Sequence, residues 1–436
     1  MNRLFQLFFI ISAVIAVSSC RPEYGRSPLP TVSCAFITKL PDGLTDLSVL
    51  SEEVHLMNKA TGVDTRYNSL DSVAASIGLY DISYIVECTF TLHGAQMRGR
   101  LVSQLADVVL TEQKDNQAVQ LPLTLRLVPQ VEDFVIQEIY FTGTLTPADK
   151  QYHGDNYVVL YNGTDHVLYA DGIAFCESRF VSTRKYDYKP DIRHEAMAVQ
   201  AVYVVPGTGK EVAVPPGGRL ILCDTGIDHK TNNPNSFDLS KANFEWYDVS
   251  TVPAHQDFDS PLVPNLDKWY CYTKSFFILH NRGFRSYVIA RVPIDKETYL
   301  KDYVYKFTWV LTHAGVSYDM SGSCYKIPND WILDGVNCSV EANIQWIILP
   351  ETIDAGYTNC GKADHQKDRY FHSVRRKFLG LDALGNPILQ DTNNSTEDFN
   401  PMVTPALVEE QGAAIDANGT PCSTKTYDGV APVVAK

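Results

Sequence analysis

A histidine–glutamate pair at positions 194 and 195 resembles the start of the zinc-protease motif. In that motif, two histidines one helical turn apart bind the metal, and the glutamate activates a water molecule. Here the chain reads His194-Glu195-Ala196-Met197-Ala198, so an alanine stands where the second histidine would be. The sequence therefore does not support a metalloprotease.

The acidic residues between positions 224 and 267 offer the hard oxygen ligands that calcium prefers. They are Asp224, Asp228, Asp238, Asp248, Asp257, Asp259 and Asp267. The densest part is His255-Gln256-Asp257-Phe258-Asp259, which makes Asp257 and Asp259 the candidate metal ligands. Solvated loop carboxylates are the favoured interpretation, and a structural calcium ion is the alternative. We expect no cofactor.

Nucleophile and nucleotide motifs are absent from the sequence. There is no GxSxG, no Walker loop and no GxGxxG, and Gly207-Thr208-Gly209 lacks the third glycine. We therefore expect that the protein is not an enzyme. The alternative is a metal-dependent extracellular hydrolase that uses the acids of the 224–267 insertion.

Two tryptophan–tyrosine pairs are the candidate binding residues. Trp246-Tyr247 and Trp269-Tyr270 both lie in a long insertion, residues 224–276. Exposed rings can stack on a sugar or anchor a protein partner, and loops on β scaffolds commonly carry function. These four residues are therefore the candidate binding loop, although rings of this kind pack more often in protein cores.

The N-terminal segment resembles a bacterial lipoprotein signal. The apolar run Leu4–Ala16 is too short for a permanent membrane helix, and Val17-Ser18-Ser19-Cys20 resembles the lipobox. We predict a signal peptide at 1–19, lipidation of Cys20, and a linker within 20–30. The lipid would anchor the chain at the outer membrane of the cell envelope, with the periplasmic and surface faces both open. An ordinary cleaved signal is the alternative.

Composition limits the partners and the domain count. The net charge of −14 argues against a nucleic-acid surface, which needs a basic face. The one dense basic run, Arg375-Arg376-Lys377, is predicted to be a solvated strand or loop face. A chain of 436 residues is too long for one ordinary core, so two or three domains are expected.

Nine cysteines remain besides Cys20, so they cannot all pair. Cys324, Cys338 and Cys360 lie in turn-rich sequence and are the better candidates for a disulfide. The sequence assigns no connectivity.

The region from Thr31 to about Val128 alternates short apolar runs with turn residues, which predicts strands. The stretches VHLMNKATG (54–62) and GLYDISYIVECTF (78–90) resemble the transthyretin-like or carboxypeptidase-regulatory-like sandwich. We predict such a sandwich at 31–129. Another immunoglobulin-like sandwich is the alternative, and either type usually serves as a spacer or contact module.

The region from Phe134 onward resembles the lamin-tail domain. The resemblance rests on FVIQEIYFTG (134–143), DNYVVLYNGTDHVLYADGIAF (155–175) and VPPGGRLILCD (214–224). The positions that match the pattern of that family are Glu138, Tyr157, Leu160, Tyr161, Asn162, Gly172, Pro216, Gly217 and Gly218. Later stretches at 327–337, 373–380 and 389–399 are similar to the closing strands of lamin-tail-like lipoproteins of Bacteroidota.

This resemblance implies an expanded lamin-tail-like β domain at 131–410, followed by a tail at 411–436. The region is more than twice as long as the compact family module, because of insertions such as 179–198 and 224–276. The predicted fold class is therefore all-β, with two successive sandwiches and long loops.

We expect a membrane-anchored, non-enzymatic binding or interaction module at the cell envelope. The resemblance to outer-membrane lipoproteins implies a TonB-dependent transporter as a partner. A glycan-binding surface protein is an alternative, as is the hydrolase described above.

Overall fold

The computed structural model describes residues 29–412 except 42, 93–94, 114–116, 130–131 and 383. The predicted signal peptide, Cys20, most of the linker and nearly all of the C-terminal tail lie outside the described residues. Within the described residues, none of the helices combines the length and the apolar character needed to cross a bilayer.

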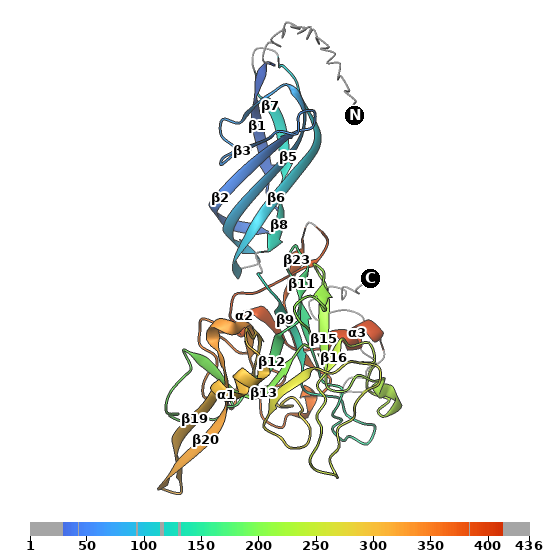
Figure 1. The fold of residues 1–436 in the computed structure, drawn as a ribbon, viewed down its shortest axis with the longest axis vertical. Helices are drawn as coiled ribbons and strands as arrows, with labels where there is room; N and C mark the ends of the chain where they lie inside the picture. Colours follow the sequence, from blue (N-terminus) through green and yellow to red (C-terminus); the bar gives the residue numbers. More distant parts are fainter. Residues whose placement is uncertain are drawn as a thin grey trace, which may run out of the picture.

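Strands β1 to β8 form a β-sandwich at the N-terminal end (Figure 1). They are Thr31–Lys39 (β1), Leu44–Asn58 (β2), Asp64–Tyr67 (β3), Ala74–Ser76 (β4), Gly78–Leu92 (β5), Ala95–Leu110 (β6), Val119–Thr124 (β7) and Arg126–Pro129 (β8). One sheet has the order β3-β2-β5-β6-β8 and the other β4-β1-β7. Strand β5 buries every second residue, from Tyr80 to Phe90, because alternate side chains of a strand point to the same face.

The strands from β9 onward form a larger sandwich. They are Val135–Tyr140 (β9), Tyr157–Tyr161 (β10), Leu168–Tyr169 (β11), Ile173–Ser178 (β12), Ala196–Val204 (β13), Ala213–Val214 (β14), Arg219–Cys223 (β15), Phe244–Glu245 (β16), Asp267–Cys271 (β17), Ser286–Arg291 (β18), Val304–His313 (β19), Val316–Pro328 (β20), Ile332–Asn337 (β21), Ser373–Arg376 (β22), Phe378–Leu381 (β23), Pro387–Leu389 (β24) and Phe399–Val403 (β25). Three short α-helices, Lys296–Asp302 (α1), Ser395–Asp398 (α2) and Ala406–Gln411 (α3), lie among the loops.

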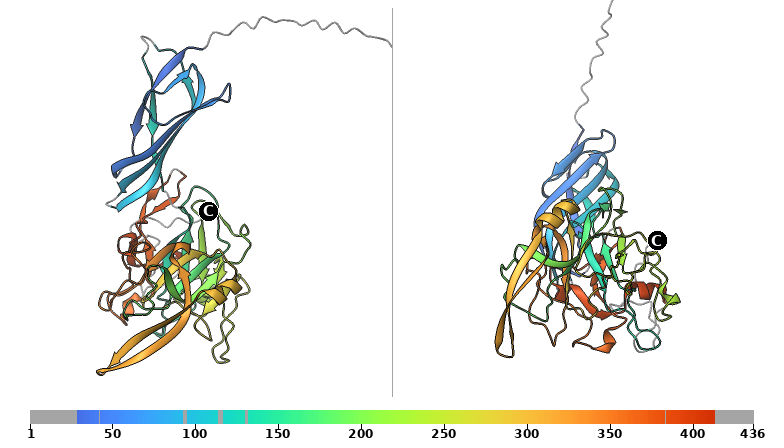
Figure 2. Two further views of the ribbon diagram at one scale, coloured as in Figure 1. Left: turned by 60° about the vertical axis from the view of Figure 1, so that its left-hand side comes forward. Right: turned by 60° about the horizontal axis from the view of Figure 1, so that its bottom comes forward.

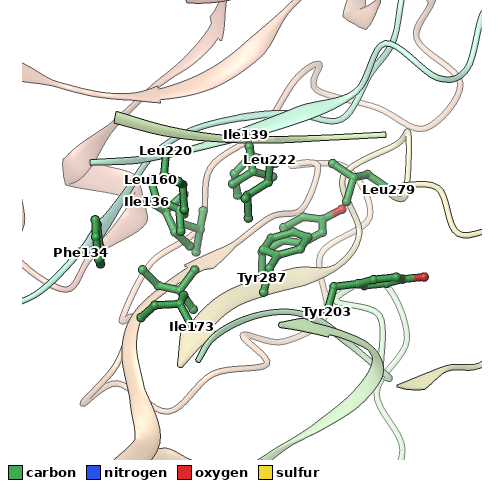
Figure 3. Close-up of a cluster of buried hydrophobic side chains, with 14 of the residues drawn as sticks. Phe134, Ile136, Ile139, Leu160, Ile173, Tyr203, Leu220, Leu222, Leu279 and Tyr287 are labelled. Carbon is green, nitrogen blue, oxygen red and sulfur yellow. The ribbon is translucent and has the colours of Figure 1, made fainter. Parts of the chain in front are cut away.

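Two sheets enclose the core of this second sandwich. One has the order β16-β15-β10-β9-β22-β25, and the other β19-β20-β13-β12-β18-β21, with β17 also paired to β13. Figure 3 shows part of the core between them, where Ile139 and Leu222 of the first sheet approach Tyr287 of the second. The predicted all-β sandwich fold is confirmed.

Burial on both faces explains why the central strands β10 and β13 are almost entirely apolar, with Gln200 as the exception. All nine residues of β13 and all five of β10 are buried. Strands covered on both sides need no polar face, so the alternation seen in β5 disappears.

A short hairpin from the C-terminal part of the chain packs against the N-terminal sandwich. Strands β23 and β24 pair with each other, and Ile388 of β24 and Leu379 of β23 pack into the core of the N-terminal sandwich. An ion pair between Arg100 and Asp165, 3.6 Å apart, also crosses this junction.

The basic run at 375–377 is not the predicted solvated face. Arg375 and Arg376 are 5% and 3% exposed, because β22 lies inside the sheet between β9 and β25. The Arg376 guanidinium ion-pairs with Asp334 at 2.5 Å and with Asp391 at 2.9 Å. Carboxylates from distant parts of the chain thus make burial of this charge tolerable.

The β19–β20 hairpin projects from the body at the end opposite the N-terminal sandwich (Figures 1 and 2). Its strands pair continuously from Val304–Tyr325 to His313–Val316. Its base carries the site described next.

Candidate functional site

A groove lined by aromatic residues lies at the base of the β19–β20 hairpin. We call it the aromatic groove. It is a hollow of about 730 Å³ formed by the segment 180–198, by β19 and by the segment 345–351. The rings that line it are Phe180, Tyr186, Tyr188, Tyr305 and Trp346. Its volume falls within the usual range for a small-molecule site.

Strand β19 supplies Tyr305 to the groove, and Phe307 and Trp309 to the two hollows beside it. Tyr305, Phe307 and Trp309 occupy every second position, so their rings lie on one face of the strand and contact one another in sequence. Tyr305 and Phe307 are buried, and Trp309 is half-buried. The face therefore passes from core to surface toward the tip of the hairpin.

The segment after β12 supplies the opposite wall. The rings of Phe180 and Tyr188 stack with centroids 3.8 Å apart. Phe180 also meets Phe307 edge-on at 5.2 Å, and Trp346 lies 6.2 Å from Phe180. Pairs in these geometries contribute about 0.5–1.5 kcal/mol each beyond their buried area.

Hydrogen bonds hold this segment against the hairpin. The Lys189 and Thr308 backbones each donate an amide to the carbonyl of the other, at 2.9 and 3.0 Å. The Tyr305 hydroxyl donates to the Pro190 carbonyl at 2.6 Å, and the Trp346 indole N–H donates to the Val181 carbonyl at 2.9 Å. The groove is therefore formed by the chain itself before any ligand arrives.

Polar side chains line the rim of the groove. They are Lys185, Asp187, Asp191, Arg193, His194, Gln345 and Glu351. Arg193 is fixed by the carbonyls of Ile348 and Leu349, at 3.3 and 2.6 Å, and by Glu351 at 3.0 Å. With two cations and three anions, the rim has a net charge of −1 at neutral histidine, whereas the whole chain has −14.

Two tyrosines of the groove, Tyr188 and Tyr305, remain protonated at neutral pH. Burial raises the pKa of Tyr188 to about 12 and that of Tyr305 to about 12. At the rim, hydrogen bonds from its own backbone amide and from Arg193 lower the pKa of Glu351. The groove thus presents neutral phenols in its interior and charged groups at its edge.

Two further hollows continue the groove along the hairpin. One, of about 610 Å³, shares Asp187 with the main hollow and is lined by Trp309. The other, of about 340 Å³, shares Lys189, Thr308 and Ser321 with the second. The three hollows therefore lie next to one another along the hairpin.

The four predicted binding residues do not form one exposed loop. Trp246 is fully buried in the main core, 6.0 Å from Phe175, so its ring is not exposed to a binding partner. Tyr247 beside it is half-buried. Trp269 and Tyr270 belong to β17 and pack half-buried against a second core cluster. The pairing of β17 with β13 turned part of the insertion into a strand and directed these rings inward.

The candidate calcium ligands are used within their own loop. Asp257 accepts the amides of Asp248 and Phe258 at 2.8 and 2.9 Å, and Asp259 accepts the Asn265 side-chain amide at 3.0 Å. In the part of the chain that the structure describes, no group of three or more His, Cys, Asp or Glu side chains is arranged to hold a metal ion.

The cysteines proposed for a disulfide carry free thiols. Cys324, Cys338 and Cys360 are all buried and unbridged. Burial raises the pKa of each thiol above its ordinary value. They pack as small apolar side chains.

The comparison with protein families concerns the C-terminal half. Residues 215–406 match DUF4876, a family described as protein of unknown function. The DUF4876 match includes β19, β20 and Trp346 but begins after the segment 180–198, which supplies the other wall of the groove. No curated protein matches the chain.

Two solved structures resemble the chain. A crystal structure of a DUF4876 family protein from Bacteroides thetaiotaomicron VPI-5482 has 22% sequence identity and a TM-score of 0.58, covering 89% of this chain and 99% of that one. It shows that the fold is shared across both sandwiches. A crystal structure of a putative cell adhesion protein from Bacteroides eggerthii DSM 20697 has 10% identity and a TM-score of 0.14, covering 69% of this chain and 77% of that one, which is too low to carry an argument.

Sequence reasoning noted the 179–198 insertion but missed its aromatic residues. One signal was available: Tyr186 and Tyr188, and likewise Tyr305, Phe307 and Trp309, follow the spacing of residues on one strand face. That spacing shows a common face but not which segment covers it.

Proposed function

We propose that this protein is a membrane-anchored, non-enzymatic binding protein of the cell envelope, and that the aromatic groove is its contact surface. The observation that carries the proposal is the preformed groove, held by the Lys189–Thr308 backbone pair and by the Phe180–Tyr188 stack. A rigid site avoids the entropy cost of ordering loops on binding.

The position of the groove supports a tethered role. A lipid on Cys20 would hold the chain at its N-terminal end. The groove lies at the base of the β19–β20 hairpin, which projects from the second sandwich away from the N-terminal one (Figure 1). The N-terminal sandwich would act as a transthyretin-like spacer. The second sandwich would act as an expanded lamin-tail-like module that carries the groove.

The rim chemistry supports binding rather than catalysis. Asp187 pairs with Lys189 at 2.9 Å, and Glu351 pairs with Arg193 at 3.0 Å. Arg193 in turn is held by two main-chain carbonyls. Charges held in this way suit recognition and orientation of a bound molecule.

The anchor is tested by growing the native organism with a clickable fatty-acid analogue. We expect label on the full chain and loss of label in Cys20→Ala. Equal labelling of the unmodified chain and of Cys20→Ala would refute the lipid anchor without bearing on the groove as a contact surface.

The contact surface is tested by capture from cell envelopes with the full chain as bait. Tyr186→Ala and Trp309→Ala should each reduce recovery of any specific partner by about tenfold or more. Phe258→Ala, which removes an exposed ring from the 224–276 insertion, is the matched control and should leave recovery unchanged. A TonB-dependent transporter is the partner that the resemblance to outer-membrane lipoproteins implies, and its absence from the captured material would count against that partner.

A further inference from the structure

We infer that the aromatic groove binds a neutral oligosaccharide several sugar units long, lying along the base of the β19–β20 hairpin. This inference rests on the proposed binding function and names its ligand class. Four features of the groove support it.

The first feature is the distribution of accessible rings. Tyr186 lines the main hollow and Trp309 lines the second, and both are half-buried, so each ring retains exposed surface. Their centroids are 6.2 Å apart with 35° between the planes. The C–H face of a pyranose ring is flat and apolar, and it packs on such a surface while its hydroxyls remain at the edge.

The second feature is the charge of the rim. Two cations and three anions nearly cancel, so the groove offers no excess of positive charge to a polyanion. The net charge of −14 on the whole chain would repel an acidic polysaccharide at long range. A neutral ligand needs no excess of positive charge in the groove and is not repelled by the net charge of the chain.

The third feature is the supply of hydrogen-bonding groups. Asp187 and Asp191 are exposed carboxylates that accept hydrogen bonds, and hydroxyl groups are the donors of a sugar. Beside them, the Trp346 indole N–H donates to Val181 and Arg184 carbonyls, and the Tyr305 hydroxyl donates to the Pro190 carbonyl. These donors are already used, so they are not offered to the carbonyls of a proline-rich peptide, the other ligand class that favours aromatic grooves.

The fourth feature is length. The hollows of about 730, 610 and 340 Å³ share lining residues in series, from Asp187 to Lys189 and Thr308. A single sugar would occupy only part of this surface. A chain of several units would place successive rings against Tyr186 and Trp309.

The test is affinity electrophoresis of the full chain in gels containing one polysaccharide each. The probes are neutral polymers (a soluble glucan, a mannan and a xylan) and the acidic polymer polygalacturonate. We expect at least one neutral polymer to retard the protein. Adding about 0.5 M salt should leave this retardation unchanged, because salt screens ion pairs and a neutral ligand forms none. Tyr186→Ala and Trp309→Ala should each weaken it by about tenfold or more, whereas Phe258→Ala should not.

A second measurement fixes the length. In calorimetry with fragments of the retarding polymer, affinity should rise from the disaccharide to longer fragments and then level off. No retardation by any neutral polymer, retardation by polygalacturonate only, or binding of a proline-rich peptide in its place would overturn the inference. If Tyr186→Ala and Trp309→Ala reduce capture of an envelope protein but no neutral polymer binds, the proposed binding function stands and only the oligosaccharide ligand is refuted. If these variants change neither the capture nor the electrophoresis, both the binding function and the ligand class are refuted.

Discussion

Phe180 and Tyr188 stack with ring centroids 3.8 Å apart and 17° between their planes, and both belong to one segment that leaves β12 and returns to β13. Tyr188 also meets Phe307 edge-on at 5.6 Å. The stack therefore holds the two ends of the segment 180–188 together, and the contact with Phe307 holds the segment against β19. The shape of the aromatic groove depends on it.

Replacing Tyr188 tests this dependence. We expect Tyr188→Ala to lower the free energy of unfolding by about 2 kcal/mol, because a half-buried ring and its stacking partners are lost. Tyr188→Phe should keep the stack and most of the stability. Urea denaturation of both variants checks this, with Phe258→Ala as the exposed-ring control. Equal loss in the Phe and Ala variants would show that the hydroxyl, not the stack, holds the segment.

Asp257 should make stability depend on pH. Burial raises its pKa to about 6, so the folded state binds a proton more tightly than the unfolded state does. The protonated form is favoured in the fold, and stability should therefore fall as pH rises from about 4 through 6. Asp257→Asn should remove about 1 kcal/mol of the change in unfolding free energy between about pH 4 and 6. The effect is this small because solvent screens the partly exposed carboxyl. Thermal unfolding between pH 4 and 8 measures it, with Asp259→Asn as control.

Arg376 should be essential for folding. Its replacement by alanine would leave Asp334 and Asp398, which are 5% and 1% exposed, without their buried cation. Breaking a buried pair in this way costs about 3–5 kcal/mol. Arg66→Ala, at an exposed ion pair, should cost less than about 1 kcal/mol. Equal midpoints of denaturation for the two variants would contradict this assignment.

Chelation should leave the protein unchanged. Because Asp257 and Asp259 are engaged within their own loop, we expect EDTA treatment and 1 mM calcium to leave the unfolding temperature within about 1 °C. Metal analysis by mass spectrometry on protein purified without chelator is the companion measurement. A stoichiometric ion together with a large shift would favour the hydrolase alternative and call for assays of the acids in the 224–267 insertion.

Local patterns of the sequence predicted strands in the N-terminal sandwich, and the resemblance to the lamin-tail domain implied strands in the second. Alternation in β5 and continuous apolar runs in β10 and β13 reflect which faces of each strand are covered, and this is recorded in the spacing of residues along the chain. The all-β fold was predicted from such spacing at 31–129 and from the lamin-tail resemblance at 131–410. The lipobox at Cys20 is likewise a local pattern, and it stays a prediction because it lies outside the described residues.

Tertiary structure decided which polar and aromatic residues are buried. Arg376 appeared to be a surface charge, because its partner Asp334 is remote in sequence and the sheet order is not written in either segment. Trp246 appeared to be a loop residue, because the stack on Phe175 depends on how two sheets pack. The groove joins Phe180 to Trp346, and Phe180 packs on Phe307 of β19. Contacts across such separations depend on the closure of the whole sandwich rather than on any local preference of the chain.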